Sequence, residues 1–286
     1  MSIPTDHHYL PQFYLQAWAA SGKLVEFSRP FRDVVSTSRS PKGTGFQPSL
    51  YSLPLEDDPH RREQIELGHM NLIDRGGAAA YRELIAGRVQ ELDDAPRSAW
   101  ALFVNSLLFR TPARLSWLDE QIRGAEFTFP EQERTDPESD SKGPTGNDLS
   151  VARMSLMIEM IGSRQLGQGI CGMVWTVLAL PSLKHGLLTS DDPIMMSNGM
   201  DRADSFLLLP LGPRHLFVAG ATERAVWAFT SQLPRDLERA INSSIVEQAE
   251  RIVIGHHSGH QRFVEARLGK VPRSPGVLGK TTWQCP

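Results

Sequence analysis

Residues 205–218, Ser-Phe-Leu-Leu-Leu-Pro-Leu-Gly-Pro-Arg-His-Leu-Phe-Val, contain two short apolar runs separated by the turn sequence Pro-Leu-Gly-Pro. Runs joined by so short a turn are typical of a β-hairpin, in which neighbouring strands are antiparallel. The runs Met173–Leu180 and Gly186–Thr189 precede them and are likewise bounded by Pro and Gly. Such connections are too short for the helical crossovers between parallel strands. We therefore expect a mainly antiparallel sheet over residues 173–219 and disfavour a doubly wound parallel sheet.

Helical periodicity predicts that much of the remaining chain is helical. The expected helices span residues 12–20, 61–86, 96–109, 149–165 and 233–253. Apolar residues cover nearly every face of the helix at 96–109, so we expect it to be central and buried. Lys23–Ser28 is expected to form one strand, followed by a loop to about Ser49. The predicted fold class is α+β, largely helical with a smaller, mainly antiparallel sheet.

The 286 residues are predicted to form one globular unit in two parts. Residues 1–130 form a helical part with one strand. Residues 131–148 contain Pro, Gly and polar side chains but no aliphatic residue, so we expect a flexible loop there. Residues 149–270 form an α+β part packed on the first, and residues 271–286 are a Pro- and Gly-rich tail.

Composition disfavours several classes of partner. The formal net charge is −3, whereas proteins that bind nucleic acid normally show a basic excess. No run approaches the roughly 18 apolar residues of a membrane span, so no membrane partner is expected. The two cysteines, Cys171 and Cys285, cannot form a disulfide framework. We expect a soluble cytoplasmic protein, and no sequence feature assigns its oligomeric state.

Asp6, His7 and His8 lie directly before the first expected helix. Pro11 marks the boundary, because it fixes its own φ and is favoured in the first helical turn. An imidazole beside a carboxylate can bind a metal or transfer a proton near neutral pH. A surface N-terminus or a capping network is equally compatible with this pattern.

Two further polar features adjoin apolar sequence. Arg110 follows the most apolar helix, and a buried guanidinium is tolerated only beside a carboxylate or an anionic ligand. Thr189–Pro193 follows an apolar strand and contains Asp191 and Asp192. Pro193 holds Asp192 extended, so we expect only one of the two carboxylates to face a pocket. A turn stabilised by Asp or Ser side chains is the alternative.

Three other patterns favour a structural interpretation. Glu66 and His69 have the i, i+3 spacing of half a dimetal site, but no second Glu-x-x-His occurs, so a solvated helix face is expected. The histidines of His256–His260 lack an adjacent acid or Cys, and we interpret them as surface residues. Gly167–Gly172 has dinucleotide-binding spacing but follows a predicted helix, so we interpret it as a turn.

The stretch His8-Tyr9-Leu10-Pro11-Gln12-Phe13-Tyr14-Leu15 resembles the opening signature His-Tyr-Val/Leu-Pro-x-Phe-x-Leu of an uncharacterised, mainly bacterial family, a domain of unknown function. The resemblance spans about residues 7–254. The downstream matches are Phe109–Pro112 to the family's Arg-Thr-Pro, Leu188–Ile194 to its Thr-Ser-Asp-Asn-Pro-Val and Pro210–Pro213 to its Pro-Leu-Ser-Pro. The chain departs from the family at Asp74, where Glu is usual, at Asp192, where Asn is usual, and at Gly212, where Ser is usual. The resemblance implies no established activity, but it favours Asp191 as the site carboxylate, because the family shares that acid.

We predict that His8, Arg110 and Asp191 converge on one pocket, because each needs a polar partner. Such a site would suit a hydrolase acting on a polar or anionic substrate. His7 or His8 would be the base or a metal ligand, Asp191 the partner carboxylate and Arg110 the anion clamp. A divalent metal held by His7, His8 and Asp191 is the cofactor that fits this set, and a small polar or anionic molecule is the expected ligand.

Two alternatives stay open. In the first, Arg110 pairs with Glu66 or Asp74 in a purely structural bridge. In the second, the protein is a non-catalytic binding or interaction protein, in which the polar cluster fixes the packing of the N-terminal segment.

Overall fold

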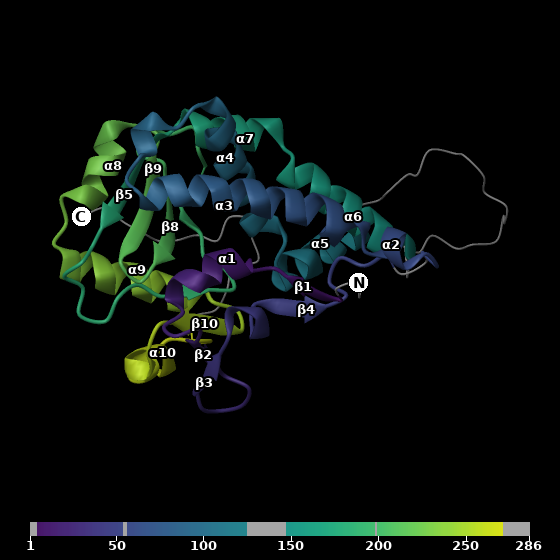
Figure 1. The fold of residues 1–286 in the computed structure, drawn as a ribbon, viewed down its shortest axis with the longest axis horizontal. Helices are drawn as coiled ribbons and strands as arrows, with labels where there is room; N and C mark the ends of the chain where they lie inside the picture. The colour runs from purple at the N-terminus through teal and green to yellow at the C-terminus, as the bar shows by residue number, and fades with distance from the viewer. Residues whose placement is uncertain (1–4, 54–55, 125–146, 198, 271–286) are drawn as a thin grey trace.

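The computed structural model describes residues 5–53, 56–124, 147–197 and 199–270, and their fold is α+β, as predicted (Figure 1). The α-helices are α1 (Gln12–Leu15), α2 (Pro59–Arg62), α3 (Asn71–Ile85), α4 (Asp94–Phe109), α5 (Pro112–Gly124), α6 (Asn147–Ile161), α7 (Arg164–Gly172), α8 (Glu223–Thr230), α9 (Pro234–Gln248) and α10 (Gln261–Glu265). The single turns of other types are η1 (Gln16–Trp18), η2 (Pro41–Gly43), η3 (Ile65–Met70), η4 (Val89–Glu91) and η5 (Ser258–His260). Of these, η3 is a π-helix and the others are 3₁₀-helices.

The described strands form three sheets in which every pair is antiparallel. The first has the order β5-β9-β8-β7, with β5 at Val174–Ala179, β7 at Met195–Met196, β8 at Phe206–Gly212 and β9 at His215–Gly220. The second has the order β3-β2-β10-β6, with β2 at Leu24–Ser28, β3 at Val35–Arg39, β6 at Thr189–Ser190 and β10 at Ile252–Gly255. The third pairs β1 (Asp6–His8) with β4 (Phe46–Pro48). The predicted hairpin is therefore confirmed as β8 and β9.

The β8–β9 hairpin lies at the centre of the core, and every residue of β8 is buried. Leu207 packs in a cluster with Trp100 of α4, whereas its neighbour Leu208 packs in a second cluster with Ile241 of α9. Helices thus cover both faces of this sheet, with α3, α4 and α7 on one side and α8 and α9 on the other. Burial on both faces explains why β8 is a continuous apolar run instead of an alternating one.

The N-terminal helix is tied to the ends of distant strands. The Tyr14 hydroxyl donates a hydrogen bond to the carbonyl of Pro210 at 2.8 Å and lies 2.8 Å from the Thr189 hydroxyl. Trp18 Nε1 donates to the carbonyl of Leu187 at 2.9 Å. Segments that resemble the family signature therefore meet in the core, where the buried aromatic residues satisfy strand-end carbonyls.

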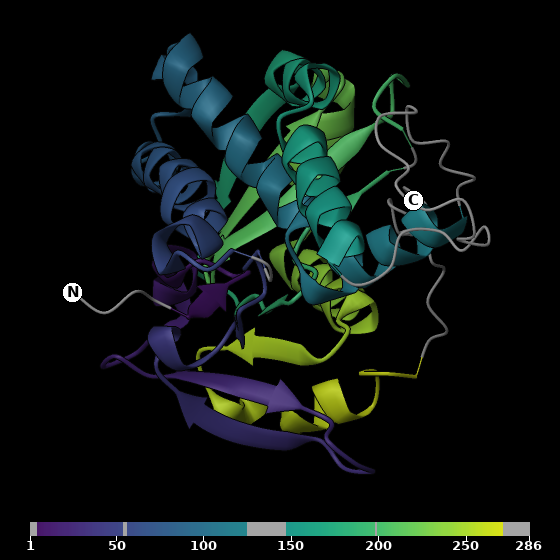
Figure 2. The same ribbon diagram turned by 90° about the vertical axis from the view of Figure 1, so that its right-hand side faces the viewer.

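The structure corrects three of the predicted elements. The strand expected at Gly186–Thr189 is present only as β6, and it belongs to the second sheet instead of the sheet of β8 and β9. The last long helix, α9, ends at Gln248, and the predicted helical residues Ile252–Val253 belong to β10. Strand β10 pairs with β2 and β6, and Figure 2 shows the yellow β10 lying beside the purple β2. The Ser-rich stretch expected to be a loop contains β3, an exposed strand at the edge of that sheet. Edge strands carry little apolar pattern, so the sequence signal there is weak.

Other predictions differ in element type or at their boundaries. The glycine-rich segment Gly167–Gly172, interpreted as a turn, belongs to helix α7, whose first turn is capped by the Ser163 side chain. Helix α6 already begins at Asn147, inside the expected loop 131–148. The rest of that loop and the tail 271–286 lie outside the described residues. Among the described residues, no helix is long and apolar enough to cross a membrane.

Candidate functional site

Strand β1 carries His7 into a buried contact with an acid. His7 Nε2 lies 2.8 Å from Glu63 Oε2, while Nδ1 accepts the backbone N–H of Tyr51 at 2.9 Å. The Nδ1 atom can accept only if it carries no proton, so the proton of the neutral ring is on Nε2, the atom that faces Glu63. The Ser52 hydroxyl also donates to the Glu63 carboxylate, at 2.7 Å. Both His7 nitrogens are therefore engaged within the fold.

His8 points to the other face of β1, because successive strand residues alternate. Its Nε2 lies 3.2 Å from the carbonyl of Lys42, and its ring packs on Phe46. Burial lowers the pKa of His8, and the positive charge of Arg110 lowers this pKa further. The side chain is therefore neutral near pH 7.

Glu66 belongs to the π-helix η3 and lies next to His8. The backbone N–H of His8 lies near its carboxylate and lowers the pKa slightly, but Oε2 is buried and has no hydrogen-bond partner within the described residues. Burial raises the pKa of Glu66 to about 7, with Arg110 opposing this shift and Asp74 adding to it. Isolated π-turns are frequent at functional sites.

His69 is exposed, so the solvated face predicted for Glu66 and His69 holds for His69 alone. The i→i+5 bonding of a π-helix widens the turn, so residues three apart no longer lie on one face. This local geometry turns Glu66 inward while His69 stays in solvent.

Arg110 ends α4 and is fully buried. Its Nη1 lies 2.7 Å from Asp74 Oδ1, and its Nε donates to the carbonyl of Tyr9 at 2.9 Å. The Tyr51 hydroxyl in turn donates to the carbonyl of Arg110 at 2.7 Å. Its remaining terminal nitrogen, Nη2, is buried without a hydrogen-bond partner among the described residues. Of the partners considered for Arg110, the structure therefore shows the bridge to Asp74.

Asp191 holds the turn between α9 and β10. Its carboxylate accepts the backbone N–H groups of Glu250 at 2.8 Å, Arg251 at 2.6 Å and Ile252 at 3.2 Å. These contacts resemble the turn-stabilising alternative more than a catalytic role. The structure thus brings His8 and Arg110 to the same electrostatic neighbourhood, whereas the gathering of Asp191 with them stays a prediction.

Within the described ranges, no group of three or more His, Cys, Asp or Glu side chains is arranged to hold a metal ion. The predicted ligands His7 and His8 lie on opposite faces of β1, which is why adjacency in sequence does not make them a chelating pair.

Comparison with known proteins identifies the family. The model of a family described as "Protein of unknown function (DUF4238)" matches residues 6–259, which is most of the chain. The chain belongs to this family. No curated protein and no solved structure matches it.

In this DUF4238 protein, sequence reasoning offered Glu66 as a possible partner of Arg110 but missed that its Oε2 is buried and unpartnered, and it missed Glu63 as the partner of His7. The sequence feature that indicated buried acids was Arg110, because a guanidinium within an apolar helix requires acids nearby. Asp74 and Glu66 were both named as such acids. Which further acids face it depends on the π-turn, and no sequence pattern marks that turn.

Proposed function

We propose that this DUF4238 protein is a hydrolase acting on a small polar or anionic substrate, with Glu66 as its general base. The carrying observation is a pair of unsatisfied charged groups, Glu66 Oε2 and Arg110 Nη2, each buried without a partner in the described part of the chain. Each group also influences the pKa of the other. One acceptor and one donor are thus open in the same neighbourhood.

We infer that a water molecule bridges these two atoms. Leaving a buried donor or acceptor unpaired costs about 1–3 kcal/mol, more for a charged group, so such atoms normally bind water or ligand. A water that donates to Glu66 and accepts from Arg110 has its reactive lone pair oriented by the protein. A carboxylate with a pKa of about 7 is well matched to removing its proton near neutral pH.

In the proposed reaction, Glu66 accepts a proton from the water as the water oxygen bonds to the carbonyl carbon or phosphorus of the substrate. The bond to the leaving group breaks, and the leaving group receives the proton from Glu66. Arg110 stabilises the negative charge that develops on the substrate oxygen. Asp74 holds the guanidinium in place through the 2.7 Å bridge. Glu66 replaces His8 as the base, because the His8 Nε2 is directed at the carbonyl of Lys42.

The test is a screen of the purified protein against chromogenic carboxylic esters, phosphate esters and anilides, followed by a pH–rate profile on the best substrate. We expect the rate to rise with pH through an inflection near 7, and Glu66→Gln to lower it at least a hundredfold. Glu91→Gln is the matched control, because Glu91 is an exposed carboxylate. A Glu66→Gln variant as active as the wild type, or an unchanged inflection in that variant, would refute the role of Glu66.

A non-catalytic binding role is the second candidate. It is favoured by the structural use of several motif residues, such as Tyr14 and Asp191, as anchors between elements. In that case no substrate of the panel is turned over, and Glu66→Gln changes only stability.

A further inference from the structure

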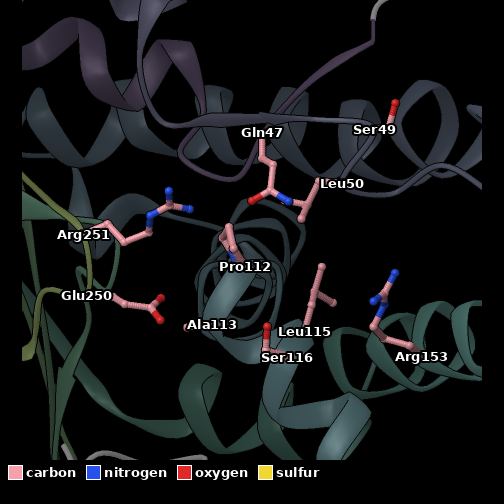
Figure 3. A pocket seen from close by; sticks show the side chains of 10 residues that line it. All are labelled: Gln47, Ser49, Leu50, Pro112, Ala113, Leu115, Ser116, Arg153, Glu250 and Arg251. Atoms are coloured by element: carbon pink, nitrogen blue, oxygen red, sulfur yellow. The ribbon is translucent and has the colours of Figure 1, made fainter. Parts of the chain in front are cut away.

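A pocket with a cavity volume of about 280 Å³ lies between the end of β4, the first turns of α5 and the turn that joins α9 to β10 (Figure 3). Its polar lining residues are Gln47, Ser49, Ser116, Arg153, Glu250 and Arg251. His8, Glu66 and Arg110 are not among the residues that line it. The pocket is therefore separate from the proposed catalytic cluster.

Arg251 is the charged group of this pocket that is open to a ligand. Its side chain is exposed, and no ion pair of its guanidinium is found among the described residues. By contrast, Arg153 Nη1 is already bound to Asp119 at 2.9 Å. The backbone of Arg251 is held in place, because its N–H donates to the buried carboxylate of Asp191 at 2.6 Å. A fixed backbone reduces the conformational freedom lost when the guanidinium binds a ligand.

Glu250 also lines the pocket. Figure 3 shows its carboxylate turned toward Ala113, at the start of α5. An acid near the first turn of a helix is stabilising there, because it faces the positive end of the helix dipole. Figure 3 shows the Arg251 guanidinium on the side of the pocket where Gln47 lies.

Three uncharged side chains with hydrogen-bond donors also line the pocket. The side chains of Gln47, Ser49 and Ser116 line the pocket, and none makes a hydrogen bond with another described residue. A guanidinium with amide and hydroxyl donors nearby matches the acceptor oxygens of a carboxylate or phosphate. Pockets for drug-sized molecules usually measure about 300–1,000 Å³, so a volume of about 280 Å³ fits a small molecule.

We propose that this pocket is a binding site for a small molecule carrying a phosphate or carboxylate group, which Arg251 recognises. The site goes beyond the proposed hydrolase function and does not require it. Gln47, on the same side of the pocket as the Arg251 guanidinium, donates a further hydrogen bond to the oxyanion.

The experiment titrates the full-length protein with inorganic phosphate and, separately, with acetate, at constant ionic strength set with chloride. Binding is measured by calorimetry and by NMR shifts of the Gln47 and Arg251 side-chain signals. We expect one saturable site per chain for at least one probe, and at least tenfold weaker binding in Arg251→Ala. Arg251→Lys should keep part of the affinity for phosphate, because lysine keeps the positive charge but lacks the paired N–H donors of a guanidinium.

Arg235→Ala is the matched control, since the Arg235 side chain is 89% exposed and remote from the pocket lining. It should bind as the wild type does. Both Arg251 variants are expected to fold, because the backbone bond to Asp191 remains. Saturation by phosphate alone assigns the ligand to the phosphate class, and saturation by acetate assigns it to the carboxylate class. Failure of the folded wild type to bind either probe overturns the proposal, as does equal weakening in Arg251→Ala and Arg235→Ala.

Discussion

Replacing Glu66 by Gln should change how the stability of this protein depends on pH. The pKa of Glu66 is raised from 4.5 to about 7, mainly by burial. In the unfolded chain this carboxyl loses its proton near pH 4.5, whereas in the folded chain it keeps the proton until about pH 7. The folded state binds more protons between these values, so the free energy of unfolding falls as the pH rises through this window.

The size of the effect follows from the shift. A shift of one pH unit corresponds to 1.36 kcal/mol, so the difference between 4.5 and about 7 corresponds to about 3 kcal/mol. Glu66 is partly exposed, and solvent screening makes this an upper value. Glutamine keeps an oxygen for the backbone N–H of His8 but cannot ionise. Relative to the wild type, Glu66→Gln should therefore gain up to about 3 kcal/mol of stability between pH 4.5 and pH 8.

Urea unfolding followed by tryptophan fluorescence, repeated from pH 4 to pH 8, measures this difference. Contributions from other titrating groups are the same in both proteins and cancel when one curve is subtracted from the other. Glu91→Gln, which alters an exposed carboxylate, should give a nearly flat difference. If the Glu66→Gln difference is the same at pH 5 as at pH 8, Glu66 is not a desolvated carboxylate and the proposed base loses its support.

The remaining predictions concern the groups around this site and the histidines near the C-terminal end. Asp74→Asn should cost about 3 kcal/mol in urea unfolding, because it leaves Arg110 buried without a charge partner, and Asp74→Glu should restore most of that stability. Asp191→Ala should lower the free energy of unfolding by about 2–4 kcal/mol, because three backbone N–H groups lose their acceptor. The amide hydrogens of residues 250–252 should also exchange faster in this variant than in the wild type. Contrary to their interpretation as surface residues, His260 is buried and His256 is half-buried, and burial lowers the pKa of each from 6.5 to about 4. The unfolded chain therefore binds more protons between these values, so stability should fall as the pH drops from 6.5 to 4. In His260→Asn the free energy of unfolding should fall less between pH 6.5 and pH 4 than in the wild type. An unchanged fall would show that the buried histidines do not cause it.

Several features of this protein are determined by local sequence. The β8–β9 hairpin follows from two apolar runs joined by a Pro- and Gly-containing turn. The buried helix α4 follows from apolar residues on nearly every face. The need of Arg110 for an acidic partner also follows, because a charge in an apolar helix cannot remain unpaired. These properties depend on backbone geometry and burial, which the residues themselves impose.

The tertiary structure alone decided which groups meet. Ile252–Val253 was predicted to end a helix, but β2 and β6 provide backbone partners on both sides and Asp191 binds the turn before it. Residues Ile252–Gly255 therefore form β10. The π-turn at η3 points Glu66 inward, and burial then raises its pKa to about 7. Pairing between distant strands and the loss of solvent around a carboxylate both depend on residues far apart in the chain, and a pattern of neighbouring residues does not contain that information.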